Sequence, residues 1–93
     1  MKNTKRAMEF DIYCDFDLNT RAQRFAGKHA ADRTVIEVRS KRRWFKTDPR
    51  VIVTFKTEAS RTDIYRSFVE DFKDYEIEII DRELYIRNKE ESQ

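Results

Sequence analysis

One segment of the chain combines the residue types that bind nucleic acid. Between residues 39 and 50 there are six lysines and arginines and one acid, with the only tryptophan and a phenylalanine near the middle. Cations neutralise phosphates and release counterions, and aromatic rings stack on unpaired bases at about 1–3 kcal/mol each. We expect the following residues of this segment to contact nucleic acid: Arg39, Lys41, Arg42, Arg43, Trp44, Lys46 and Arg50.

The same segment has an ordinary structural interpretation. Trp44 would pack over the edge of the core against Val53, as large aromatic side chains commonly do. The lysines and arginines would then only keep an exposed sheet edge soluble. The two interpretations differ in whether the indole and the cations are free to meet an anionic partner.

Helical spacing predicts a second basic surface. Arg21, Arg24 and Lys28 lie at i, i+3 and i+7, opposite an apolar stripe that includes Phe25 and Ala26. We expect one exposed row that adds to the basic segment if the two surfaces are neighbours. Ordinary solubility of a surface helix is the alternative.

Carboxylates follow the outward side and the end of the first predicted strand. They are Glu9, Asp11, Asp15 and Asp17. Mg²⁺ usually takes one or two carboxylates plus waters and substrate phosphates, so these acids suggest a third hypothesis, phosphodiester cleavage. In element order and in residues 12–17 the chain resembles the small Cas2-type nuclease-like proteins, and that resemblance implies a Mg-dependent nuclease.

A simpler interpretation of these acids is cross-strand pairing with cations such as Arg39, Lys56 or Arg87, and we prefer it. The one cysteine, Cys14, and the one histidine, His29, both fall on predicted inward faces. They are too few for an intramolecular disulfide or a zinc site. We therefore predict no enzyme activity, no catalytic residue, no metal and no cofactor.

Seven elements must position these residues. Asp17 or Asn19 is placed to cap the first helix, and Ser60 with Asp63 resembles a capping box at the second. A turn at residues 48–49 should join the second and third strands into a hairpin. Alternation predicts strands over 8–17, 34–39, 51–57, 76–80 and 83–87, and helical spacing predicts helices over 19–31 and 60–73.

The order β-α-β-β-α-β, with room for a short fifth strand, predicts an α+β fold. We expect a ferredoxin-like split β-α-β sandwich with two helices on one face of an antiparallel sheet. Residues 1–93 would form a single domain, with 1–7 and 89–93 flexible. RNA-recognition-motif proteins share this element order, but the third strand lacks their glycine-aromatic pattern. Outward Tyr13, Ile52, Ile80 and Tyr85 leave monomer and homodimer open.

Charge is divided along the chain. Residues 1–56 hold fourteen lysines and arginines against seven acids, and residues 57–93 hold six against eleven. This asymmetry predicts a basic surface for an anionic partner. Our leading hypothesis is a small non-enzymatic, nucleic-acid-binding regulatory module that binds RNA or another single-stranded nucleic acid, with RNA favoured over duplex DNA.

The alternative hypothesis is a protein–protein interaction factor. It would be an inhibitor or adaptor of the kind a phage or other mobile element encodes, with a host protein as its partner. The chain has no stretch apolar enough for a membrane span and no signal-peptide core. We accordingly expect a cytoplasmic protein without a membrane partner.

Overall fold

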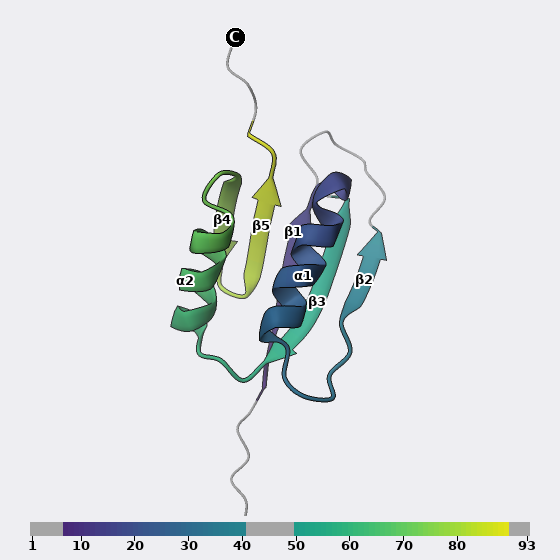
Figure 1. The fold of residues 1–93 in the computed structure, drawn as a ribbon, viewed down its shortest axis with the longest axis vertical. Coiled ribbons are helices and arrows are strands. Elements are labelled where there is room, and N and C mark those ends of the chain that lie inside the picture. Colours follow the sequence, from purple (N-terminus) through teal and green to yellow (C-terminus); the bar gives the residue numbers. More distant parts are fainter. Residues whose placement is uncertain (1–6, 41–49, 90–93) are drawn as a thin grey trace, which may run out of the picture.

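The computed structural model describes residues 7–40 and 50–89, which form two helices and five strands (Figure 1). A short 3₁₀ helix, η1, covers Phe16–Leu18. Neither described helix has the length and apolarity to cross a bilayer. The remaining elements are β1 (Met8–Cys14), α1 (Asn19–His29), β2 (Glu37–Ser40), β3 (Val51–Thr57), α2 (Arg61–Asp71), β4 (Glu76–Ile80) and β5 (Glu83–Arg87).

The strands form one sheet in the order β2-β3-β1-β5-β4, and both helices lie on the same face of it (Figure 1). The predicted α+β class and ferredoxin-like sandwich are confirmed. The sheet is mixed, however, because β1 is antiparallel to β3 but parallel to β5. The turn at residues 81–82 reverses the chain after β4, so β5 enters the sheet between β1 and β4.

The core lies between the sheet and the helices. Along β1 the side chains of Phe10, Ile12 and Cys14 are fully buried, as strict alternation predicts. The ring of Phe25 on α1 meets Phe55 of β3 and Phe68 of α2 edge-on, with centroid distances of 6.1 and 5.7 Å. One aromatic side chain therefore joins α1, the sheet and α2.

The N-cap of α1 differs from the prediction, although the helix begins at residue 19 as predicted. Its N-cap is Leu18 without a side-chain cap, so neither Asp17 nor Asn19 caps it. The chain first makes η1, which buries Leu18, and the carboxylates of Asp15 and Asp17 instead accept hydrogen bonds from Asn88. The second cap is as predicted, because the N–H of residue 63 donates to the Ser60 hydroxyl at 3.1 Å.

Strand β2 begins three residues later than predicted. The chain turns at residues 31–34, where Arg33 has a φ of 66° and the Thr34 hydroxyl donates to the Ala31 carbonyl at 2.7 Å. The Ala31 N–H in turn donates to the Lys56 carbonyl of β3. This turn occupies the place where the first residues of a longer strand would pair with β3.

Gly27 lies in the interior of α1 on its exposed side. A Cβ there would have Ile36 Cδ1 as its nearest described neighbour, at an ordinary contact distance of 4.0 Å. We predict that Gly27→Ala raises the free energy of unfolding by about 0.5–1 kcal/mol, because alanine loses less backbone entropy in a helix. Urea denaturation followed by circular dichroism measures this change. The converse control, Gln23→Gly on the same helix, should lower stability, and a destabilised Gly27→Ala would contradict the prediction.

Candidate functional site

Helix α1 presents a basic side that lines a groove. Arg21, Arg24 and Lys28 share this side, and the helix contains no aspartate or glutamate. Together with Phe25, Asp71 and Phe72 they line a hollow of about 220 Å³ between α1 and α2. The predicted row is therefore present, and it lies beside the end of α2.

The three cations of this row differ in which charged or aromatic side chains lie beside them. The Lys28 ammonium lies 2.6 Å from an Asp71 carboxylate oxygen, so Asp71 offsets its charge. The Arg21 guanidinium lies 5.9 Å from the centroid of the Tyr75 ring. Neither Arg21 nor Arg24 forms an ion pair with a described acid. Among the described residues, no carboxylate therefore offsets the charges of the two guanidinium groups at the groove.

The predicted basic hairpin is described only at its flanks. Lys41, Arg42, Arg43, Trp44 and Lys46 lie outside the described residues. Ser40 pairs with Val51, and Val51 pairs with Cys14, so both flanks of this segment reach the sheet end that precedes α1. Arg50 lies at this end with its backbone N–H donating to the Cys14 carbonyl at 3.1 Å.

Arg39 lies apart from the α1 row. It alternates with Val38, which shares the helix-covered side of the sheet with its partner Val53, so Arg39 points to the open face. There its guanidinium donates to the Thr54 hydroxyl at 3.0 Å. The structure therefore places Arg39 and the α1 cations on opposite sides of the sheet.

The open face of the sheet carries two cross-sheet rows with one residue from each strand. We call the first the acid row: Glu37, Thr54, Asp11, Glu83 and Ile80. We call the second the tyrosine row: Arg39, Ile52, Tyr13, Tyr85 and Glu78. Strand register sets both rows, because each residue is the direct pairing partner of the next.

Two stacked rings stand at the centre of the tyrosine row. Tyr13 and Tyr85 lie 4.7 Å apart between centroids with an interplanar angle of 12°. The Tyr85 hydroxyl donates to Glu83 at 2.8 Å. Burial and then this hydrogen bond raise the pKa of Tyr85 to about 12, and burial followed by the charges of Asp11 and Glu83 raises the pKa of Tyr13. Both phenols are therefore neutral at physiological pH.

In the acid row, the Thr54 hydroxyl makes the hydrogen bonds that were expected to be ion pairs between strands. The Thr54 hydroxyl donates to Asp11 at 2.7 Å and accepts from Arg39. The four ion pairs among the described residues include none to Arg39, Lys56 or Arg87. The predicted cross-strand pairing of outward acids with these cations is thus wrong for the described residues, since a buried threonine stands between Arg39 and Asp11.

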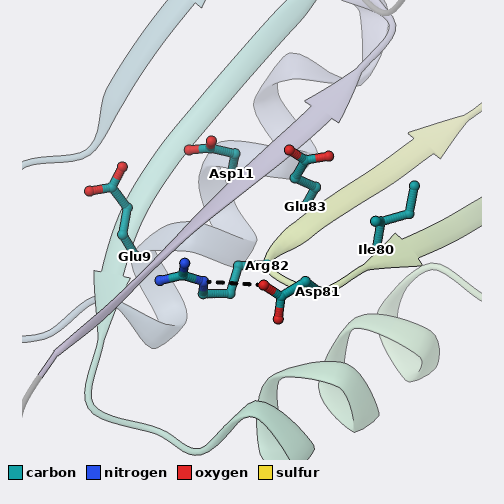
Figure 2. A pocket seen from close by; sticks show the side chains of 6 residues that line it. All are labelled: Glu9, Asp11, Ile80, Asp81, Arg82 and Glu83. Atoms are coloured by element: carbon teal, nitrogen blue, oxygen red, sulfur yellow. Dashed lines mark ion pairs between the residues drawn. The ribbon is translucent and has the colours of Figure 1, made fainter.

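A polar hollow of about 450 Å³ opens at one end of the acid row. Figure 2 shows Glu9 and Asp11 from β1 together with residues 80–83, which run from the end of β4 through the turn to the start of β5. The one cation drawn there, Arg82, has its Nε 3.7 Å from Asp81. The backbone N–H of Asp11 donates to the Arg82 carbonyl at 3.0 Å and holds this turn against β1. The hollow is therefore rich in carboxylates.

The candidate catalytic carboxylates already accept hydrogen bonds, and they do not gather at one point among the described residues. Asp15 and Asp17 accept from Asn88, while Asp11 accepts from Thr54. Within residues 7–40 and 50–89 no group of three or more histidines, cysteines and acids is placed to hold a metal. Burial raises the pKa of the Cys14 thiol to about 12, so this thiol is a poor nucleophile. This geometry gives the nuclease hypothesis no support.

Sequence reasoning placed Tyr13 and Tyr85 outward but missed their contact. The signal for the outward face is simple alternation, whereas the contact depends on parallel pairing of β1 with β5. That pairing joins residues 72 positions apart, and no local pattern specifies it.

Comparison of the chain with protein-family models, with curated proteins and with solved structures finds no match.

His29 connects the two helices beside the basic groove, and its Nε2 lies 2.8 Å from the Ser67 hydroxyl. Burial and then the charge of Lys28 lower its pKa, while Asp71 acts in the opposite direction. Below its usual pKa of 6.5 the unfolded chain takes up a proton more readily than the folded chain. We predict that the stability contributed by neutral His29 is present above pH 6.5 and is lost as the pH falls below it.

Urea denaturation between about pH 7 and pH 5 tests this linkage. His29→Gln should keep a hydrogen-bonding group at the position and should lose less stability on acidification than the parent chain. Equal slopes of stability against pH in the two proteins would show that His29 does not carry the effect.

Proposed function

We propose that this protein is a small non-enzymatic module that binds RNA or another single-stranded nucleic acid, chiefly through its phosphate backbone. The observation that carries the proposal is the side of α1 with three cations and no acid, beside the groove shared with α2. Arginine and lysine side chains neutralise phosphates and supply most of the affinity of such complexes. Binding would therefore depend strongly on salt and weakly on base sequence.

Arg21 and Arg24 are the residues best placed to contact phosphates. They lie one helical turn apart, with about 5–6 Å between Cβ atoms in an ideal helix, and both are exposed. Planar guanidinium groups donate paired hydrogen bonds to phosphate oxygens. Lys28 would contribute less, because Asp71 already offsets its charge.

The proposal includes the basic hairpin predicted from the sequence. Residues 41–49 connect Ser40 to Arg50, and both flanks lie at the end of the sheet that precedes α1. Cations of this segment could continue the phosphate contacts of α1, and Trp44 would stack on an unpaired base. Because Arg39 lies on the open face and bonds to Thr54, we expect it to contribute least.

The charge of the sheet directs nucleic acid to the helix side. The acid row sets carboxylates across the face that RNA-recognition-motif proteins use for stacking, so phosphates would be repelled there. Helix α1 lies flat on the sheet beside α2 and offers one side only, which suits a single strand better than a major groove (Figure 1). Such a module would regulate by occupying the RNA.

We predict that Arg21→Gln/Arg24→Gln weakens binding of labelled single-stranded RNA. Each lost phosphate contact should lower the slope of log affinity against log salt by about 0.7. Fluorescence anisotropy at several salt concentrations measures both quantities, and quenching of the single indole of Trp44 gives an independent signal. The parent chain should bind single-stranded RNA more tightly than duplex DNA.

The matched control is Arg61→Gln/Arg66→Gln on α2, which removes the same charge away from the groove. This control should bind RNA nearly as well as the parent chain. An equal loss in both double variants would indicate non-specific attraction, and no salt-dependent binding by the parent chain would refute the proposal.

A further inference from the structure

The open face of the sheet has a net negative charge among the described residues. Its six carboxylates outnumber its three cations, and Glu9 and Glu78 are exposed without an ion pair to a described residue. The carboxylates belong to Glu9, Asp11, Glu37, Glu76, Glu78 and Glu83, and the cations to Arg39, Lys56 and Arg87. A partner for this face must supply positive charge.

The rings of the tyrosine row favour one kind of cation over another as a partner for this face. Tyr13 and Tyr85 form a half-buried stacked pair in the middle of the face, between Ile52 and Glu78. Guanidinium groups stack on aromatic rings more readily than ammonium groups do, and they also bond carboxylates in pairs. Rings flanked by carboxylates therefore favour arginine over lysine.

The hollow at the end of the acid row offers a place for a cationic side chain. Glu9, Asp11 and Glu83 line it together with the Asp81–Arg82 pair, whose cation already has an acid beside it (Figure 2). The hollow lies over β1, β5 and β4, whereas the whole face is five strands wide, about 19 Å at the usual spacing between neighbouring strands. A single small cation cannot reach both the hollow and the opposite edge, whereas a peptide segment can.

We propose that the open face of the sheet is a docking surface for an arginine-rich segment of a protein partner. One arginine enters the hollow beside Glu9 and Asp11, and another lies against Tyr13 and Tyr85 near Glu78. This interaction is separate from nucleic-acid binding, because α1 lies on the opposite side of the sheet (Figure 1).

The charge of the face argues against two other occupants. A second copy of the chain placed symmetrically on this face would bring like charges together, which costs free energy. A nucleic acid would meet the acid row with its phosphates. An arginine-rich protein segment complements both the carboxylates and the rings.

Anisotropy of a labelled oligo-arginine peptide tests the docking surface. We predict saturable binding to the parent chain and weaker binding of an oligo-lysine peptide of equal length. Glu9→Lys/Glu78→Lys should weaken oligo-arginine binding about tenfold, because two exposed carboxylates at the contact are reversed. The matched control, Glu70→Lys/Asp74→Lys on α2 and the turn after it, makes the same change in net charge and should weaken binding less than about twofold.

A second pair of variants tests the rings. Tyr13→Phe keeps the stacked ring and should bind oligo-arginine like the parent chain, whereas Tyr13→Leu should bind about threefold more weakly. Thermal unfolding of each variant confirms that it is folded. Arg21→Gln/Arg24→Gln should bind the peptide unchanged, which separates this proposal from the RNA proposal.

Several results would overturn the docking surface. Equal losses in the two charge-reversal variants would leave only non-specific attraction. Spermine that displaced the peptide at equal charge concentration would show that any polycation suffices. RNA binding that is lost in Tyr13→Leu would assign the rings to bases, and a dimer that Glu9→Lys/Glu78→Lys dissociates would assign the face to self-association.

Discussion

The position of Phe25 sets the geometry of the helix layer. Its ring packs against Phe55 of the sheet and against Phe68 and Phe72 at the end of α2, with all three centroids within 6.1 Å. These contacts fix how α1 is rotated about its axis, because the buried side of a helix determines its exposed side. The groove between the helices, and the direction in which Arg24 points, follow from that rotation.

Charge within the first half of the chain is divided between the two sides of the sheet. The first half of the sequence is strongly basic, yet β1 contributes Glu9 and Asp11 to the acidic open face. Helix α1, from the same half, contributes only cations. The alternation of β1 and the periodicity of α1 direct these groups to opposite sides of the molecule. The basic side of α1 and the acidic open face therefore lie on opposite sides of the sheet.

Local patterns predicted most of the fold and one part of the candidate site. The two-residue period of β1 and the apolar stripe of α1 placed Phe10, Ile12 and Phe25 in the core, and the same stripe implied the row of Arg21, Arg24 and Lys28. These inferences succeeded because a residue's face depends only on its neighbours in the chain.

Features that depend on contacts distant in sequence were not predictable. The parallel pairing of β1 with β5, the stacked tyrosines and the contact of Arg39 with Thr54 all depend on register between separate strands. The cap of α1 was mispredicted for a related reason, because the Asp17 carboxylate accepts hydrogen bonds from Asn88, which is distant in sequence. A short stretch of sequence does not show which distant residues will compete for a side chain's hydrogen bonds.

The insertion of β5 beside β1 also has a consequence for synthesis of the chain. Among the described elements β1 is made first, and β5, its second neighbour in the sheet, is made last. Until β5 emerges from the ribosome, one edge of the central strand has unpaired amide and carbonyl groups and the nascent core is incomplete. The β4–β5 hairpin must therefore pair with β1 before the central strand is protected from mispairing and aggregation.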